Sequence, residues 1–307
     1  MNLKSLFYPK SIAVVGASAS TGGGKIPYLQ IQQMSGYAGT LYPVNPKYKE
    51  ISGLKAYASL DELPDGIDLT IVGAPVGQAI DIVRTAARKG FKYLHFFTSG
   101  FGETGNRQLE EDLVREATRG GVRIIGPNCI GILCTESGIG FNTDKDMLDK
   151  GSPGTIAFLG QSGGITSNFC RVATTRKIRL NKVVSYGNQI DLGVEDYLDY
   201  FADDETIRLV ACYIEDIKDA RAFLNVLRRT TARKPVIILK GGKTESGSKA
   251  AASHTGALAS DYRIWASAMF SRECATRSRL LMPSWPSSNS FRPRSPTWGT
   301  TGSTCPS

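Results

Sequence analysis

Histidine is nearly absent from this chain, which has only His95 and His254 among its 307 residues. Whatever imidazole chemistry the protein performs must therefore use one of these two side chains. His95 lies within the apolar run 92–97, and we predict that it belongs to the core. His254 lies in a loop of small residues, 253–259, just beyond an apolar run at 235–239. Because the unperturbed pKa of histidine falls nearest neutrality, we expect His254 to act as base, acid or nucleophile.

Long apolar runs and metal-binding spacings are also missing. No run approaches the roughly 20 apolar residues that a membrane-spanning helix needs, and no secretory h-region follows Met1, so we expect a cytoplasmic protein without a membrane partner. No CxxC pair and no Cys/His metal spacing occurs, so we expect neither a bound metal nor a disulfide framework. The six cysteines are scattered along the chain, at Cys129, Cys134, Cys170, Cys212, Cys274 and Cys305.

The chain has a net charge of +9 at pH 7, and much of it lies in the C-terminal segment, where the composition changes. After residue 269, five arginines stand against the single acid Glu273, so about half of the net charge lies in 270–307. The rest of the chain shows no stripe of basic residues interleaved with aromatic residues, so the sequence does not predict nucleic-acid binding. The segment 270–307 is rich in Ser, Pro, Arg and Trp. We expect it to be a disordered or out-of-frame tail without function.

Strand-like runs and helical patterns alternate through the first 269 residues. We expect strands at 11–15, 41–44, 69–72, 93–97 and 122–125, then at 155–159, 182–185, 209–214 and 235–239, with the N-terminus leading almost directly into the first. Helices are expected at 25–36, 76–89, 106–119, 165–176, 194–202 and 219–232. The alternation predicts an α/β fold of two doubly wound domains, 1–150 and 151–269, with ligands at the carboxyl ends of the strands.

A turn of small residues follows the first expected strand. Gly16-Ala17-Ser18 leads into the glycines 22–24 and a helix, which is the setting of a phosphate-binding turn. The next strand ends in Asn45-Pro46-Lys47, where a nicotinamide-binding domain would carry an acid for the ribose. A lysine suits an extra phosphate better than a bare ribose. We therefore favour a phosphorylated nucleotide such as coenzyme A over NAD, and a purely structural turn remains an alternative.

A second glycine-rich turn, Gly160-Gln161-Ser162-Gly163-Gly164, has two interpretations. As a nucleophile elbow, it would make Ser162 the nucleophile of a hydrolase, with Asp191 or Asp216 orienting His254 as base. As a strand–turn–helix, it would cradle a phosphate with backbone amides and a hydroxyl. We favour the phosphate interpretation, because a hydrolase would leave the N-terminal domain without a role and lacks an upstream oxyanion motif.

Glu215 follows the apolar run 209–214 and is expected at the same sheet edge as Gln161 and the His254 loop. A carboxylate there would accept the imidazole N–H and raise the nucleophilicity of His254. A solvated loop acid is the equally simple alternative.

Four motifs, taken in order, resemble those of the succinyl-CoA synthetase α subunit and, still more, of the α part of the NDP-forming acyl-CoA (acetate–CoA) synthetases. They are Val15-Gly16-Ala17-Ser18, Gly126-Pro127-Asn128-Cys129, Gly160-Gln161-Ser162-Gly163-Gly164 and Ser253-His254-Thr255-Gly256-Ala257. The resemblance covers residues 1 to about 269. It implies a Rossmann-like CoA-binding domain followed by a flavodoxin-like succinyl-CoA-ligase domain.

The resemblance also assigns roles to residues. His254 would be phosphorylated, Glu215 would support it, and the phosphate would lie near Gln161-Ser162-Gly163. Cys129 would lie beside the thioester rather than act as a nucleophile. Coenzyme A would contact the loops Gly16-Ala17-Ser18, Asn45-Pro46-Lys47, Ala74-Pro75 and Thr98-Ser99-Gly100, with its thiol toward Asn128-Cys129.

The implied reaction interconverts acyl-CoA, phosphate and nucleoside diphosphate with acid, CoA and nucleoside triphosphate, through an acyl phosphate and a phosphohistidine. The amides of the Ser162 turn would stabilise the phosphoryl group in transfer. ATP or ADP with Mg would be bound by an ATP-grasp β subunit or a fused C-terminal half, which this sequence lacks. A non-catalytic CoA-binding module is therefore the second hypothesis, and the serine hydrolase is the third.

Overall fold

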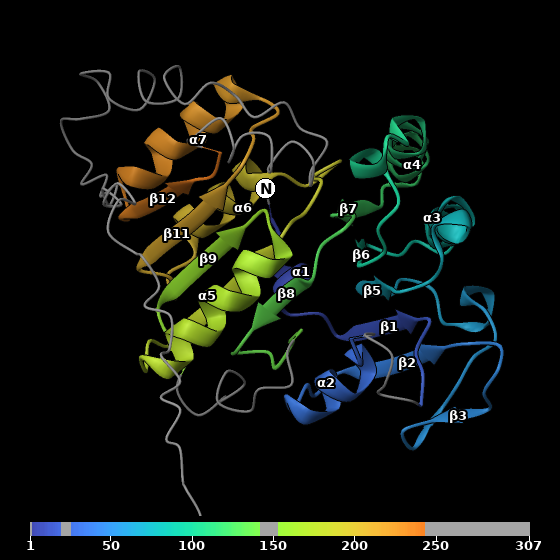
Figure 1. Ribbon diagram of the computed structural model, residues 1–307. Helices are drawn as coiled ribbons and strands as arrows, with labels where there is room; N and C mark the ends of the chain where they lie inside the picture. Colours follow the sequence, from blue (N-terminus) through green and yellow to red (C-terminus); the bar gives the residue numbers. More distant parts are fainter. Residues whose placement is uncertain (1, 20–25, 142–152, 243–307) are drawn as a thin grey trace, which may run out of the picture.

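Two five-stranded sheets, each with helices on both faces, form the framework of the molecule (Figure 1). The computed structural model describes residues 2–19, 26–141 and 153–242. His254 and the tail 270–307 lie outside the described residues, so the expectations for them stay predictions. Within the described residues, no helix combines the length and the apolar character needed to cross a membrane.

The first sheet is entirely parallel, with the strand order β2-β1-β5-β6-β7. Its strands are β1 (Ser11–Val15), β2 (Thr40–Val44), β5 (Leu69–Val72), β6 (Tyr93–Phe96) and β7 (Arg123–Ile125). Strands β5 and β6 are buried along their whole length, as expected for a parallel sheet covered on both faces.

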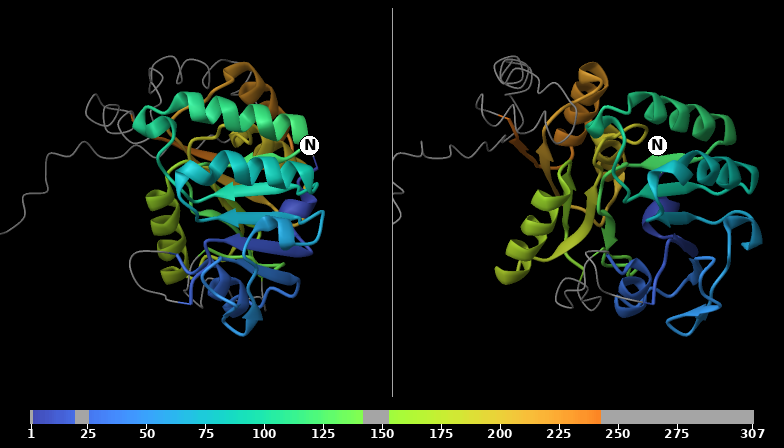
Figure 2. Two further views of the ribbon diagram at one scale, coloured as in Figure 1. Left: turned by 90° about the vertical axis from the view of Figure 1, so that its right-hand side faces the viewer. Right: turned by 45° about the vertical axis from the view of Figure 1, so that its right-hand side comes forward.

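Helix α2 (Tyr28–Met34) covers one face of this sheet, and α3 (Ala79–Arg88) and α4 (Arg107–Gly120) pack together on the other face (Figure 2). A small hairpin of β3 (Glu50–Ile51) and β4 (Leu54–Lys55) follows β2. Three short 3₁₀ turns complete the domain, η1 (Leu60–Glu62), η2 (Val76–Gln78) and η3 (Gly102–Thr104).

The second sheet has the order β12-β11-β9-β10-β8. Its strands are β8 (Gly131–Cys134), β9 (Ile156–Gly160), β10 (Leu180–Ser185), β11 (Leu209–Ile214) and β12 (Val236–Lys240). Helix α5 (Gly163–Thr175) packs on β9 and β10, and α6 (Val194–Asp203) packs against α7 (Ala220–Thr231) on the opposite side (Figure 1). The expected α/β fold is confirmed, and each expected strand and helix is present within a few residues.

Strand β8 was not expected from the sequence. It precedes the connection near residue 150, yet it pairs antiparallel with β10 at the edge of the second sheet, Ile132 opposite Val184. The chain therefore enters the second sheet before the connection that was expected to separate the domains. The division at residue 150 stays a prediction about domains rather than a description of the sheets.

The expectation that the N-terminus leads almost directly into a strand is wrong, because a one-turn helix, α1 (Lys4–Phe7), comes first. The Phe7 ring stacks on Tyr200 of α6, with ring centroids 5.1 Å apart. Further contacts join α2 to the residues on either side of β8: the Tyr28 hydroxyl donates to Ile130 O at 3.0 Å, and the Gln32 amide nitrogen donates to Gly140 O at 2.7 Å. One hydrophobic cluster consequently runs through both domains.

Candidate functional site

A cleft of about 540 Å³ opens at the carboxyl end of the first sheet. It gathers most of the loops that the sequence assigned to coenzyme A. The predicted residues that line it are Gly16, Ala17, Ser18, Ala74, Pro75, Thr98, Ser99 and Asn128. Their elements are β1, β5 and β6 and the loop after β7, which end side by side because the sheet is parallel.

The turn after β1 is shaped by Gly16. Its φ is +82°, and a Cβ on it would lie 3.0 Å from the carbonyl carbon and oxygen of Gly73. Only glycine fits a left-handed backbone pressed against the neighbouring strand end. The loop after β7 is drawn to the same edge, since the Asn128 N–H donates to Thr98 O at 3.0 Å. These contacts bring the turn after β1 and the loop after β7 to one cleft at the carboxyl ends of the strands, where ligands of doubly wound sheets bind.

Some of the predicted coenzyme A residues do not line the cleft. Pro46 and Lys47 are exposed, and Asn45 supports the turn by donating from its amide to Ala17 O at 2.7 Å. Gly100 instead donates its N–H to Glu103 Oε1 at 2.6 Å. Residues of α2 and its approach also line the cleft, although they were not predicted to do so: Ile26, Pro27, Tyr28, Leu29 and Gln30.

Cys129 lies beneath the cleft rather than in it. It is 3% exposed, and burial raises the pKa of its thiol well above the usual range. A thiol that stays protonated is a poor nucleophile, in keeping with a merely neighbouring role. His95 accompanies it in the core, as predicted: its Nε2 lies 3.1 Å from Cys129 O, and burial lowers the pKa of His95 to about 4.

The second cluster of predicted residues lies at the carboxyl end of the second sheet. Ser162 caps the N-terminus of α5, where its Oγ accepts the Ile165 N–H at 3.4 Å. Gly163 and Gly164 form the first turn of this thirteen-residue helix. Helix N-termini with small residues leave backbone N–H groups accessible to an anion, so the turn can hold a phosphate.

Glu215 lies one strand away from this turn, at the end of β11. It is 6% exposed, which rejects the interpretation as a solvated loop acid. The Gln161 Oε1 atom accepts the Glu215 N–H at 2.8 Å and the Asp216 N–H at 2.9 Å, so Glu215 lies beside the Gln161-Ser162 turn. The expected partner of Glu215, His254, lies outside the described residues.

The serine hydrolase interpretation is not favoured. The Asp191 carboxylate accepts hydrogen bonds from the Arg123 guanidinium and, at 2.7 Å, from the Ile124 N–H, so it is committed to the contact between β7 and the loop before α6. Asp216 donates its backbone N–H to Gln161 Oε1 at 2.9 Å, and burial raises the pKa of its carboxyl, which weakens it as a charged orienting group. Ser162 serves as a helix cap.

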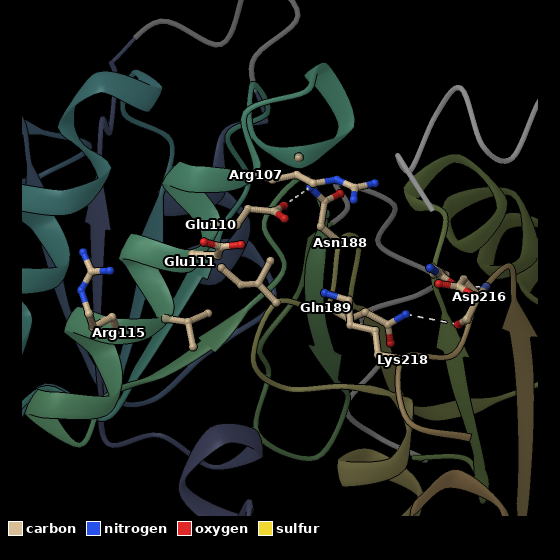
Figure 3. A pocket seen from close by; sticks show the side chains of 12 residues that line it. Arg107, Glu110, Glu111, Arg115, Asn188, Gln189, Asp216 and Lys218 are labelled. Carbon is tan, nitrogen blue, oxygen red and sulfur yellow. Dashed lines mark hydrogen bonds between the residues drawn. The ribbon is translucent and has the colours of Figure 1, made fainter. Parts of the chain in front are cut away.

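A second cavity, of about 600 Å³, lies between α4 and the loops that follow β10 and β11. Figure 3 shows Arg107, Glu110 and Glu111 of α4 facing Asp216 and Lys218 across it. Asn188 joins the two sides, since its amide donates to Glu103 Oε2 at 2.5 Å and to Glu110 Oε1 at 2.8 Å. Three acids and three bases line it. Gln161 and Asp216, which the sequence analysis named, are among its lining residues.

Metal binding has no structural support in the part of the chain that is described. No group of three His, Cys, Asp or Glu side chains lies close enough there to hold a metal ion.

Comparison with protein families divides the chain into two matches. Residues 10–135 match a CoA binding domain, and residues 153–279 match a succinyl-CoA ligase like flavodoxin domain. The second match extends past residue 269, into the segment that was expected to be a tail.

Individual relatives agree with these matches. The chain is 40% identical over 266 residues to an acetate–CoA ligase (ADP-forming) of Methanocaldococcus jannaschii, covering 87% of this chain and 37% of that protein. It is 39% identical over 269 residues to the α subunit of acetate–CoA ligase (ADP-forming) II of Pyrococcus furiosus, covering 87% of this chain and 58% of the subunit. The chain thus spans between about a third and three fifths of the length of these relatives.

A solved structure is similar over the same region. It is the dinucleotide-forming acetyl-coenzyme A synthetase 1 of Candidatus Korarchaeum cryptofilum in complex with phosphate and ADP. The TM-score is 0.80 at 36% identity, covering 87% of this chain and 57% of that one.

Proposed function

We propose, from the premise that this chain belongs to the family of ADP-forming acyl-CoA synthetases, that it is the α portion of an acid–CoA ligase. The observation that carries the proposal is the pairing of two sites on one molecule. A cleft is lined by the expected coenzyme A loops, including Asn128, and a helix N-terminus at Ser162 lies beside the buried Glu215. One site suits a CoA thioester, and the other suits a phosphoryl group.

The reaction begins when a phosphate oxygen attacks the thioester carbonyl carbon. The C–S bond breaks, and an acyl phosphate and the CoA thiol are released. An imidazole nitrogen of His254 then attacks the phosphorus, the bond between phosphorus and the acyl oxygen breaks, and the acid leaves as a carboxylate. The phosphoryl group finally passes from His254 to a nucleoside diphosphate. In the opposite direction, the same steps activate an acid.

The chain's residues stabilise charge during these steps. The N–H groups of the first turn of α5 face the charge that develops on the phosphoryl oxygens, which lowers the barrier to transfer. The Glu215 carboxylate accepts the imidazole N–H of His254 and thereby raises its nucleophilicity. Asn128 lines the CoA cleft, and in this proposal it contacts the thioester.

The nucleotide site belongs to a partner under this proposal. An ATP-grasp β subunit, or a fused C-terminal half, binds the nucleoside diphosphate with Mg, and the complex acts in the cytoplasm. The α-subunit relatives of Pyrococcus furiosus are in keeping with a separate partner. The names of the relatives point to acetate as the acid to test first.

The test is the intact mass of the full chain after incubation with acetyl-CoA and inorganic phosphate. We expect a gain of one acid-labile phosphoryl group, which His254→Ala abolishes. His95→Gln is the matched control, because it removes the other histidine from a buried position and should leave the gain intact. No gain, with coenzyme A binding retained, would instead support a non-catalytic CoA-binding module.

A further inference from the structure

The end of strand β11 is held by side chains from the strands on both of its sides. From β9, the Gln161 Oε1 atom accepts the N–H groups of Glu215 and Asp216, at 2.8 and 2.9 Å. From β12, the Lys240 ammonium donates to Glu215 O at 2.8 Å. Both polar groups of the Glu215 backbone are therefore bound by neighbouring side chains.

All three side chains are buried, with exposed fractions of 3% for Gln161, 6% for Glu215 and 7% for Lys240. Burial makes these hydrogen bonds costly to lose, because an unsatisfied buried amide keeps its full desolvation penalty. The backbone hydrogen bonds between β11 and β12 also continue past the end of β12, since the Gly241 N–H donates to Ile214 O at 2.8 Å. The Glu215 backbone thus has little freedom to shift.

The two bonds to Gln161 also fix which way its amide faces. Two backbone N–H donors can bind only the oxygen of the carboxamide, so the Oε1 atom must face Glu215 and Asp216. Lys240 adds a cation next to these two acids, and burial lowers the pKa of its ammonium against the opposing effect of Asp216 and Glu215. The backbone geometry at Glu215 is held by Gln161 and Lys240 together.

We propose that Gln161 and Lys240 are positioning residues that hold Glu215 in place for phosphoryl transfer at His254. The role rests on the proposed function, in which Glu215 supports the histidine. Gln161 was expected from the sequence to bind phosphate, whereas its oxygen is committed to the backbone of the neighbouring strand end. A phosphate would bind the NH2 group of Gln161 and not this acceptor oxygen, so a positioning role is distinguished from a phosphate ligand by an effect on the rate of transfer rather than on the affinity for phosphate.

The first experiment compares Gln161→Met with the wild-type full chain, using acetyl-CoA and inorganic phosphate and following phosphorylation of His254 by mass. We expect the rate at saturating phosphate to fall about 10- to 100-fold, because small errors of position slow catalysis. The phosphate concentration that gives half of the maximal rate should be nearly unchanged. If the half-saturating phosphate concentration rises while the rate at saturation is unchanged, the positioning role is overturned and Gln161 is a phosphate ligand.

Gln32→Met is the matched control. Gln32 is also a fully buried glutamine whose side chain binds backbone, donating to Gly140 O and accepting from Gly140 N–H at 3.1 Å. It lies in α2, away from the second sheet's carboxyl end. We expect a similar loss of stability and an unchanged rate. An equal fall in rate for both variants would show that general destabilisation, not positioning, is responsible.

Rescue is tested with Gln161→Glu. A protonated carboxyl has the shape and the acceptor oxygen of the amide, whereas its ionised form adds a charge beside Glu215. The rate relative to wild type, measured at each pH, should therefore rise as the pH falls. A ratio independent of pH would contradict the role.

Lys240→Met tests the other side of the strand end. We expect a lower saturating rate for this variant, and a wild-type rate would remove Lys240 from the proposal. Lys182→Met serves as its control, because Lys182 is also buried but binds Thr206 Oγ1 at 3.0 Å near the opposite end of the sheet.

Hydrogen exchange separates this role from the proposed function. In Gln161→Met, the amides of Glu215 and Asp216 should exchange faster than in wild type, whatever the reaction. A wild-type chain that takes up no phosphoryl group would overturn the proposed function and this role together. This role alone would be overturned if the wild type is phosphorylated and Gln161→Met is phosphorylated at the same rate. It would also be overturned if the amides of Glu215 and Asp216 exchange no faster in Gln161→Met than in wild type.

Discussion

Asp191 and Arg123 form a two-pronged ion pair where the two domains meet. The Arg123 Nε donates to Asp191 Oδ2 at 2.9 Å, and a terminal guanidinium nitrogen donates to Oδ1 at the same distance. Asp191 Oδ2 also accepts the Ile124 N–H, which anchors β7 to the loop before α6. The pair is largely shielded from solvent, with side-chain exposures of 31% and 20%.

We predict that Asp191→Ala destabilises the chain by about 2 kcal/mol, because it strands a half-buried guanidinium and one backbone N–H. The pair of Arg115 and Asp112, three residues apart within α4 and with side-chain exposures of 53% and 31%, provides the control. Asp112→Ala should change stability little, since solvent screens such pairs. Urea unfolding curves for both variants test this. Equal effects would mean that the contact between the domains contributes no more than a surface pair.

Gly16 is predicted to control coenzyme A binding. A Cβ at this position would collide with Gly73, so Gly16→Ala should shift the turn that lines the cleft and weaken coenzyme A binding about tenfold or more, equivalent to at least about 1.4 kcal/mol. Gly53 has a similar φ, +78°, but open space around it and no place in the cleft. Gly53→Ala should therefore leave the affinity unchanged, as measured by calorimetry. Loss of affinity in both would mean that backbone strain alone is responsible.

Ser162 is predicted to matter as a cap and not as a nucleophile. Ser162→Ala should cost about 1 kcal/mol of stability, as the loss of a helix cap usually does. Ser162→Asp keeps a capping oxygen but places a negative charge at the phosphate turn, so stability should be retained while phosphorylation of His254 falls. A fluorophosphonate probe should not label the wild-type chain. Labelling that Ser162→Ala removes would revive the hydrolase hypothesis.

We predict that the buried His95 makes the stability of the chain depend on pH. Burial lowers the pKa of His95 from 6.5 to about 4, so between these values the unfolded chain binds a proton that the folded chain does not. The stabilisation is complete above pH 6.5 and is lost as the pH falls toward 4. Each pKa unit corresponds to about 1.4 kcal/mol, which gives a loss of up to about 3 kcal/mol.

The measurement is the unfolding free energy of wild type and His95→Gln from pH 7.5 to 4. The difference in slope between the two chains isolates the contribution of His95. Parallel curves would show that His95 is not held neutral by burial.

The sheet and its loops could be predicted because the local sequence determines them. Strands such as β1 and β5 are short runs of apolar residues closed by glycine, and both have the bounds expected from that pattern. Parallel strands then bring their carboxyl ends to one edge, so the sequence predicts that Gly16, Ala74 and Thr98 lie together, and all three line the same cleft.

The features that the sequence did not indicate depend on contacts between distant segments. Helix α1 is a single turn without a capping side chain, and it exists because Phe7 packs on α6. Strand β8 looks like loop in sequence, and its pairing with β10 makes it a strand. The position of Gln161 was predicted, but its bonds to Glu215 and Asp216 could not be, because they depend on the register between β9 and β11.

The pairing of β8 with β10 bears on how the chain is made and how it can be cut. Translation delivers β8, with its buried Ile132 and Leu133, before β9, α5 and β10 have left the ribosome. Until then this segment has only the N-terminal domain to shelter it. A fragment that ends between β8 and β9 would leave the same strand without its partner and expose an apolar edge, which favours self-association. Separate production of the two domains should therefore cut before Gly131, so that β8 stays with the sheet it completes.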